Sequence, residues 1–173
     1  MSSSVRPAPS PWIAWIDLAT AMVALARTGC KAATVKPESP RVPKRTLQPK
    51  NLSFQPRPTY PYSPGTEAGG WVFTAGQVAW DEHSQIVGSG DVEAQTRQVL
   101  SNIRSVLAEA GASMADVVKC NVYLADIRTF QTMNRVFAEF FPDEPPARTT
   151  VQAALADEAM LVEIEAIAFT GRT

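Results

Sequence analysis

The residues that most often carry metals, nucleophiles and disulfides are scarce in this chain of 173 residues. It has one histidine, His83, in the polar run WDEHSQ, and two cysteines, Cys30 and Cys120, in unrelated segments. A Ser-His-Asp hydrolase and a metal centre built around histidine are therefore excluded. The two cysteines do not indicate a disulfide framework, and a reducing compartment, the cytoplasm, fits them best.

An excess of charge of either sign is also missing, because 16 Lys and Arg stand against 17 Asp and Glu, for a net charge of −1. The basic residues are scattered rather than clustered, so we expect no nucleic-acid partner. The phosphate-binding patterns GxGxxG and GxxxxGK[ST] and the nucleophile pattern GxSxG do not occur. Nucleotide-binding units and α/β-hydrolase chemistry are therefore not indicated.

Long apolar runs are absent as well. The longest stretch, Pro11–Ala26, is interrupted by Asp17 and is shorter than the roughly 20 residues that span a bilayer. It admits three interpretations: an export signal, an amphipathic helix or anchor, or a segment outside the working protein, with synthesis beginning near Val42. We prefer the last interpretation, and we expect no membrane partner.

The N-terminal region differs from the rest of the chain. Residues Lys36–Pro58 hold many prolines and basic residues and few apolar ones, a composition that cannot form a packed core. We therefore expect residues 1–50 to be an extension and residues 51–173 to be the single folded domain. The last residues before the domain proper, Asn51–Phe54, are expected to add an edge strand.

Strands and helices follow in a clear order after residue 60. The pattern predicts a hairpin of Ser63–Glu67 and Trp71–Thr74 around Gly69-Gly70. A helix is expected to begin at the N-cap Asp91 and to end at Gly111. The further elements expected are a strand at Val117–Leu124, with Val118, Cys120, Val122 and Leu124 on its core side, and a helix at Thr129–Phe141, stopped by Pro142.

Two strands close the chain, about Ala147–Ala153 and Leu161–Phe169. In the second, alternate side chains make one wholly apolar face, and the opposite face is apolar except for Glu163 and Glu165. A strand that is apolar on both faces is usually central and covered on both sides. We therefore expect Arg148 of the first strand and Glu163 of the second to lie on adjoining strands of a buried sheet.

A buried carboxylate must be paired, neutralised or chemically active, because an isolated buried charge is costly. One interpretation is a structural ion pair between Arg148 and Glu163. The other is a small pocket in which the planar Arg148 binds the carboxylate of a substrate and Glu163 handles a proton or a water. The residues alone leave both interpretations open.

From about Thr59 to Phe169 the chain resembles the RidA/YjgF family, the reactive intermediate (imine/enamine) deaminases. The order and spacing of the matching segments make the resemblance specific for the family. These segments are PYSPG (Pro61–Gly65), FTAGQV (Phe73–Val78), DVEAQTRQVLSNIRSVLAEAGAS (Asp91–Ser113), DVVKCNVYLADI (Asp116–Ile127), MNRVFAEFF (Met133–Phe141), PARTTVQ (Pro146–Gln152) and VEIEAIA (Val162–Ala168).

The resemblance implies an α+β, chorismate-mutase-like fold in which a mixed sheet carries two helices on one face. Three copies are expected to form a barrel, a homotrimer with active sites in the clefts between subunits. The implied activity is that of a 2-iminobutanoate/2-iminopropanoate deaminase-type hydrolase. It would convert 2-imino or enamine acids, such as 2-aminoacrylate, to 2-oxo acids and ammonia. These reactive intermediates are released by PLP-dependent dehydratases, and the reaction needs no metal or cofactor.

The same resemblance assigns roles to individual residues. Arg148 matches the family arginine that binds the substrate carboxylate, and Glu163 matches the residue that positions or activates the water. Tyr62 matches the pocket tyrosine of the PY motif. Gly76 belongs to a turn in the pocket floor, where glycine permits close approach of the backbone to a ligand.

Two positions of the expected site depart from the best-studied family members. Ala75 stands where these have Ser, and Thr150 stands where they have Cys. Both are expected to line the substrate pocket, and losing the Ser hydroxyl removes one hydrogen bond worth about 0.5–1.5 kcal/mol. These departures leave room for a rival function, a non-catalytic trimer of the same fold that binds small carboxylates or acts like a chaperone.

Overall fold

The computed structural model describes residues 42–50, 52 and 61–171. The apolar segment Pro11–Ala26, Cys30 and most of the expected edge strand Asn51–Phe54 lie outside the described residues, so the interpretations made there stay predictions. Within the described ranges, no helix combines the length and the apolar character that crossing a membrane requires.

The elements follow one another in the order that the sequence predicts. The strands are β1 (Arg45–Leu47), β2 (Gly65–Ala68), β3 (Trp71–Thr74), β4 (Val117–Leu124), β5 (Ala147–Gln152) and β6 (Val162–Phe169). The α-helices are α2 (Val92–Glu109) and α3 (Phe130–Phe140), and the short 3₁₀ helices η2 (Met114–Asp116) and η3 (Ile127–Thr129) precede β4 and α3.

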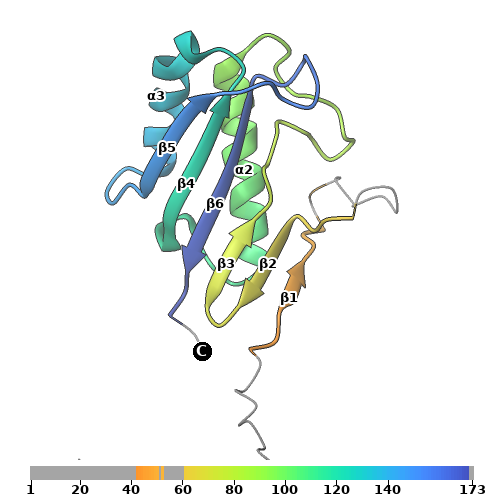
Figure 1. Cartoon of the computed structure of the whole chain (residues 1–173), viewed down its shortest axis with the longest axis vertical. Coiled ribbons are helices and arrows are strands. Elements are labelled where there is room, and N and C mark those ends of the chain that lie inside the picture. The colour runs from red at the N-terminus through yellow and green to blue at the C-terminus, as the bar shows by residue number, and fades with distance from the viewer. Residues whose placement is uncertain (1–41, 51, 53–60, 172–173) are drawn as a thin grey trace, which may run out of the picture. The chain divides into compact units, whose positions relative to one another are not determined.

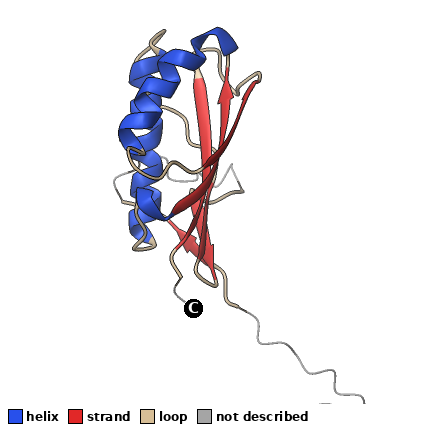
Figure 2. Cartoon of the chain, turned by 90° about the vertical axis from the view of Figure 1, so that its left-hand side faces the viewer, coloured by secondary structure: helices blue, strands red, loops and turns tan. Residues whose placement is uncertain are grey.

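The strands of the described chain form one mixed sheet in the order β1-β2-β3-β6-β4-β5. Neighbouring strands are antiparallel except β4 and β5, which are parallel because α3 carries the chain back between them. Both α-helices lie on one face of this sheet (Figure 1, Figure 2). The expected fold class, α+β with a mixed sheet and two helices on one face, is confirmed.

Local sequence explains the first hairpin. Ala68 pairs with Trp71, so the loop between β2 and β3 has only two residues, Gly69 and Gly70. Their φ angles are +56° and +80°, and positive values at both central positions are what a type I′ hairpin turn requires and glycine adopts without strain. The predicted turn is therefore confirmed.

Helix α2 begins and ends where the sequence predicts. The carboxylate of Asp91 accepts hydrogen bonds from the backbone N–H groups of Glu93 and Ala94 at 2.9 and 3.2 Å, an N-cap worth about 1 kcal/mol. Gly111, with φ +66°, ends the helix in the left-handed conformation.

The hydrophobic core lies between the two α-helices and the covered face of the sheet. It is formed from α2 by Val92, Val99, Leu100, Ile103, Val106 and Leu107, from α3 by Met133, Val136 and Phe137, and from β4 and β6 by Cys120, Val122, Leu124, Val162, Ile164, Ala166 and Ala168. The face of β6 predicted to be wholly apolar is therefore the face that packs against the helices.

Two expectations are corrected by the sheet. Strand β4 lies between β5 and β6, so Arg148 and Glu163 are not on adjoining strands. A register shift between Val117 and Lys119 turns Val118 outward, where it is 45% exposed, and Val117 takes its expected place in the core. The two edges of the described sheet are β1 and β5, and the expected edge strand Asn51–Phe54, most of which lies outside the described residues, stays a prediction.

The second face of β6 is not covered in the single chain. Glu163, Glu165 and Ile167 are partly exposed there. Around them the open face carries large apolar side chains of 42–45% exposure: Trp71, Phe73, Val118, Val151 and Phe169. The expectation that β6 is covered on both sides is therefore wrong for one copy of the chain.

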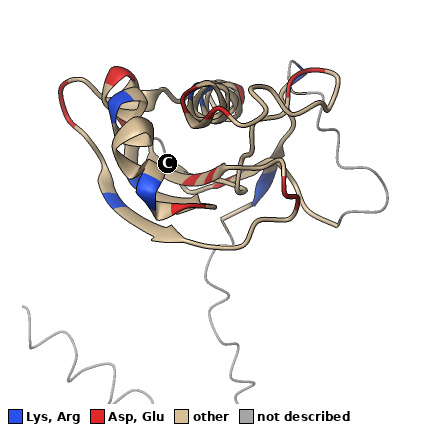
Figure 3. Cartoon of the chain, turned by 90° about the horizontal axis from the view of Figure 1, so that it is seen from above, with Lys and Arg blue, Asp and Glu red and all other residues tan. Residues whose placement is uncertain are grey.

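Seen from above, the helices form one layer and the sheet the other, and neither sign of charge gathers on one side (Figure 3).

Candidate active site

Arg148 lies on the face of β5 that is turned toward α3. It pairs with Cys120 of β4, a core residue that is fully buried, so both side chains project to the helix side. The guanidinium donates a hydrogen bond of 2.7 Å to Oδ1 of Asn134. Its carbon lies 4.5 Å from the ring centre of Phe137 and 5.4 Å from that of Phe130, distances of favourable cation–π contact.

The guanidinium of Arg148 has unused binding capacity. Arginine has five N–H donors, and the hydrogen bond to Asn134 is the contact that the described residues make with them. No ion pair joins Arg148 to a carboxylate within the described ranges, so the structural ion pair with Glu163 is absent. Partial burial lowers the pKa of Arg148 from its ordinary value, which leaves a cation whose desolvation an incoming anion would offset.

Asn134 and the two rings form the support of Arg148 that the sequence reasoning missed. The signal was present, because Phe130, Asn134 and Phe137 follow one another at helical spacing and so share one face of α3. A polar residue between two aromatic residues on a core-facing stripe indicates a partner that needs its hydrogen bond. We call Arg148, Asn134, Phe130 and Phe137 the arginine cluster.

Thr150 lies on the same side of β5 as Arg148, opposite Val122. Its hydroxyl oxygen is enclosed and has no hydrogen-bond partner among the described residues. The hydroxyl is therefore turned into the protein in the single chain, and its predicted contact with substrate stays a prediction.

We expect Thr150→Val to raise the free energy of unfolding by about 1–3 kcal/mol, because valine keeps the shape and removes an unsatisfied buried hydroxyl. The measurement is chemical denaturation at one fixed protein concentration, since assembly also affects apparent stability. The matched control is Thr149→Val, which removes an exposed hydroxyl that accepts a 2.7 Å hydrogen bond from Lys119. A Thr150→Val protein no more stable than the wild type would contradict the expectation.

Glu163 and Gly76 meet at the turn that follows β3. Gln77 and Ile164 exchange backbone hydrogen bonds of 2.8 and 3.0 Å, which hold this turn against β6. A Cβ atom added to Gly76 would lie 2.8 Å from Cδ of Glu163 and closer still to its Oε1. Gly76 does not have a positive φ. Its missing side chain therefore leaves room for the Glu163 carboxylate itself rather than serving an unusual backbone conformation.

The carboxylate of Glu163 is half-buried and accepts no hydrogen bond from any described residue. Burial raises the pKa of Glu163, and the negative charge of Glu165 raises it further. A carboxyl group without donors and with a raised pKa is suited to hold and transfer a proton near neutral pH.

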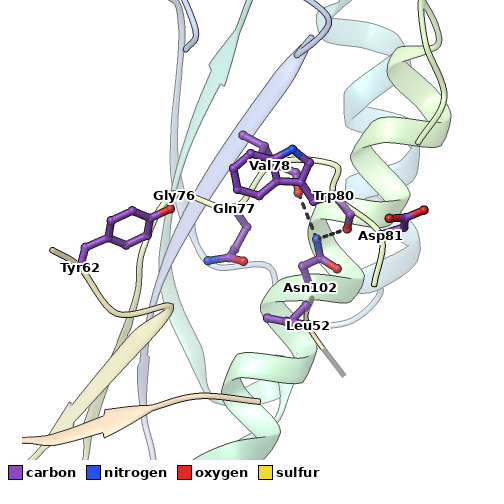
Figure 4. Close-up of a pocket in the computed structure, with 8 residues that line it drawn as sticks. All are labelled: Leu52, Tyr62, Gly76, Gln77, Val78, Trp80, Asp81 and Asn102. Carbon is purple, nitrogen blue, oxygen red and sulfur yellow. Dashed lines mark hydrogen bonds between the residues drawn. The ribbon is translucent and has the colours of Figure 1, made fainter. Parts of the chain in front are cut away.

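Tyr62 and Gly76 line one small hollow, with the Tyr62 hydroxyl directed toward Gly76 (Figure 4). The remaining lining residues are Leu52, Gln77, Val78, Trp80, Asp81 and Asn102. Ala75 directly precedes the lining residue Gly76 in the chain. Its backbone N–H donates a hydrogen bond of 2.8 Å to the carbonyl of Pro64. The expected pocket tyrosine and the expected turn thus lie together, beside Glu163.

Buried amides fix the chain that follows this turn. Asn102 of α2, 5% exposed, donates from Nδ2 to the carbonyls of Val78 and Trp80, at 3.0 Å each. Gln98 donates at 2.9 Å to Oδ1 of Asn102. Helix α2 therefore positions the chain after the turn, and with it Gly76, against which the Glu163 carboxylate lies. We call Glu163, Gly76 and Tyr62 the glutamate cluster.

The two clusters lie on opposite faces of the sheet. Arg148 pairs with Cys120 of β4, which in turn pairs with Ala166 of β6, and these paired side chains face the helices. Glu163 pairs with Tyr123 of β4, and both side chains lie on the open face of the sheet. One copy of the chain therefore does not bring Arg148 and Glu163 into the same pocket, although each has the surroundings of a reactive group.

Other candidates for chemistry are weaker. Burial raises the pKa of Cys120 to about 12, so its thiol stays protonated and its assignment as a core residue is confirmed. Across the residues that the structure describes, no group of His, Cys, Asp and Glu side chains could hold a metal ion.

Comparison with known proteins identifies the family. A sequence model of the family described as Endoribonuclease L-PSP matches residues 53–170. The chain belongs to the RidA/YjgF family. It is 45% identical to a RutC family protein of Pyrococcus horikoshii over 114 aligned residues. The alignment covers 66% of this chain and 90% of that protein.

Solved structures of the RidA/YjgF family have the same fold. A Rid family protein of unknown function from Yersinia pestis matches with a TM-score of 0.67 at 33% identity, covering 74% of this chain and 100% of that protein. TdcF of Escherichia coli, solved with bound serine, matches with a TM-score of 0.65 at 32% identity. This match covers 72% of this chain and 98% of TdcF. Family membership thus agrees with the motifs that the sequence analysis identified.

Proposed function

We propose that this RidA/YjgF protein hydrolyses reactive 2-imino and enamine acids, of the 2-aminoacrylate/2-iminopropanoate type, to 2-oxo acids and ammonia. The observation that carries the proposal is the guanidinium of Arg148, half-buried, supported by two rings and an amide, and without an acidic partner among the described residues. Such a group is built to receive an external carboxylate.

Arg148 would bind the substrate carboxylate through two parallel N–H donors and so fix the position of C2. Asn134 leaves these donors free, because it accepts from only one nitrogen, Nη2. The rings of Phe130 and Phe137 limit rotation of the guanidinium. Binding the carboxylate in one orientation supplies much of the catalysis, since imine hydrolysis is chemically easy and gains chiefly from positioning.

Glu163 would carry the proton. In its protonated form it donates to the imine nitrogen, and as a carboxylate it then removes a proton from the water that attacks C2. The proton next passes to the amine nitrogen, the C–N bond breaks, and Glu163 recovers a proton from the hydroxyl as the C=O bond forms. The cycle returns Glu163 to its starting state and yields one 2-oxo acid and one ammonia. Tyr62, beside Gly76, would close the pocket and hydrogen-bond the substrate or the water.

A complete site would need two copies of the chain. Because the arginine and glutamate clusters lie on opposite faces of the sheet, we propose that Arg148 of one copy meets Glu163 of the next in a homotrimer. The uncovered aromatic residues Trp71, Phe73 and Phe169 support a subunit interface on the open face. Heterologous contacts of this kind close into a ring when the rotation fits.

The substrate class is supported by a relative. TdcF was solved with serine, a small amino acid with a carboxylate, and it is 32% identical to this chain. We propose that the present protein binds small imino acids through Arg148. It would act in the cytoplasm, where PLP-dependent dehydratases release such intermediates, without a metal or cofactor and without nucleic-acid or membrane partners.

The test generates 2-iminopropanoate in place with an amino-acid oxidase and traps it with semicarbazide. We expect the protein at micromolar concentration to compete with the trap, so that semicarbazone forms more slowly and pyruvate appears. The rival function, a non-catalytic binder, predicts at most stoichiometric protection that does not grow with time. No competition would reject the deaminase proposal. RNA is incubated in parallel, because the family description names an endoribonuclease.

A further inference from the structure

The two glutamates of β6 share one face of the sheet but have different surroundings. Glu165 pairs with Asn121 across to β4, and Glu163 pairs with Tyr123. The two carboxylates lie two positions apart on one strand, which corresponds to roughly 6.6 Å along the backbone. Both therefore belong to one small acidic surface on the open face, although the proposed mechanism uses only Glu163.

The hydrogen bonds distinguish these carboxylates. Oε1 of Glu165 accepts from Nδ2 of Asn121 at 2.7 Å and from the hydroxyl of Tyr123 at 3.4 Å. Within the described residues Glu163 accepts none. Donors favour the charged form of a carboxylate, and a half-buried carboxylate without donors favours the neutral form.

We propose that the Glu165 carboxylate, fixed by Asn121 on the same face of β6 as Glu163, holds the resting proton on Glu163. Glu165 is thus a positioning residue that acts on the proton, and it does not touch the substrate. The inference rests on the proposed function, in which a protonated Glu163 begins the cycle. Two neighbouring carboxylates whose environments push them apart in this way are a common means of assigning acid and base roles.

Electrostatics supports the direction. Burial is the larger cause of the raised pKa of Glu163, and the charge of Glu165 raises it further, because a negative charge within about 7 Å disfavours a second negative charge. The charge of Glu165 is also the largest cause of the raised pKa of Tyr123. Glu165 is therefore electrostatically coupled both to Glu163 on β6 and to Tyr123 on the neighbouring strand β4.

The other charged and titratable groups that face Glu163 do not replace this effect. From β4 these are Tyr123 and Lys119, and the ammonium of Lys119 is bonded to Thr149 of β5 at 2.7 Å. Tyr62 contributes a phenol from the loop before β2. Neither the described turn 75–77 nor β5 presents a titratable side chain to this face. In the proposed trimer, Arg148 of a neighbouring copy would oppose the effect of Glu165 on the proton affinity of Glu163.

The test is a carboxyl ¹³C NMR titration of the assembled protein, in which the Glu163 resonance is assigned from Glu163→Gln. We expect Glu165→Gln to lower the pKa of Glu163, since one nearby negative charge is removed. The matched control is Glu109→Gln, the same chemical change at the end of α2 in the helix layer. A Glu163 titration that is equal in Glu165→Gln and in Glu109→Gln would overturn the inference.

A second variant keeps the inference testable if Glu165→Gln does not assemble. Asn121→Leu removes the 2.7 Å donor that fixes the Glu165 carboxylate, so we expect the Glu163 resonance to titrate at lower pH than in the wild type, as in Glu165→Gln. An unchanged Glu163 titration would show that the contact between Asn121 and Glu165 does not act on Glu163, and would also reject the inference.

The pH dependence of turnover links the titration to the reaction. Activity is expected to fall as pH rises through the pKa of Glu163, because the protonated form starts the cycle. In Glu165→Gln this alkaline limb should move to lower pH by the same amount as the NMR titration. A shifted titration with an unshifted limb would reject the role in catalysis. Absence of any turnover in the wild type would reject the proposed function instead, and the NMR result would stand apart from it.

Discussion

Neither Arg148→Ala nor Glu163→Gln should deaminate 2-iminopropanoate alone, but mixed trimers that contain both variants should recover about a third of the wild-type rate. Each single change removes one half of every site. In a mixed trimer, a site works only where the copy that supplies Arg148 and the copy that supplies Glu163 are each intact at that position, which is true at about one interface in three.

The single variants are expected to lose about 100-fold or more in kcat/KM. For Arg148→Ala, truncating one partner of an arginine–carboxylate contact commonly costs 2–5 kcal/mol, and each 1.4 kcal/mol is about tenfold. For Glu163→Gln, losing a positioned proton-transfer group commonly costs about 10²–10⁴-fold. The measurement is pyruvate formation in competition with semicarbazide, made on proteins co-expressed with two different affinity tags and purified through both. This selection enriches mixed rings and removes rings of a single type.

The matched control is Arg135→Ala. Arg135 is an exposed arginine on the same helix that supports Arg148, and its contact is a 3.5 Å hydrogen bond to Thr132. We expect its activity to equal that of the wild type. Mixed rings as inactive as the single variants would contradict a site shared between copies, whereas full activity in either single variant would contradict the mechanism.

Most of the fold could be predicted because its signals are local. The Gly69-Gly70 turn, the Asp91 cap and the Gly111 stop each follow from the conformation that one or two residues prefer. The core stripes of α2 and α3 follow from helical spacing. These features depend on neighbours within a few positions, so the sequence displays them directly.

The strand order could not be predicted in the same way. Two strands that follow one another in the chain, β5 and β6, are separated in the sheet by β4. The loop between them gives no sign of this crossover, because the pairing of β4 with both strands is a long-range choice made by packing. The bulge that turns Val118 outward has the same origin.

The candidate site was found in outline and misjudged in detail. Residue types alone drew attention to Arg148 and Glu163, because a charged residue in an apolar strand needs an explanation. Their separation onto opposite faces depends on the strand order, so the sequence suggested one pocket where a single chain has two clusters. Asn134 was missed because its partner lies on a strand whose position was unknown.

Gly76→Ala is expected to lower kcat/KM by about 100-fold, because displacing a catalytic group by about 1 Å has that order of effect. The added methyl would lie 2.8 Å from Cδ of Glu163 and closer still to Oε1. The carboxylate is the far end of a flexible side chain, so it moves and the backbone does not. Since Gly76 has no positive φ, the midpoint of thermal unfolding should stay near that of the wild type.

A double-mutant cycle separates this cause from a general disturbance of the pocket. If the methyl acts by displacing the Glu163 carboxylate, Gly76→Ala should cost nothing further in a Glu163→Ala background, because the group that it displaces is gone. Additive losses would show that the methyl instead blocks the substrate or distorts the turn held by Gln77 and Ile164. A fully active Gly76→Ala protein would mean that the position of the Glu163 carboxylate does not matter, and the proton-transfer role would have to pass to another group.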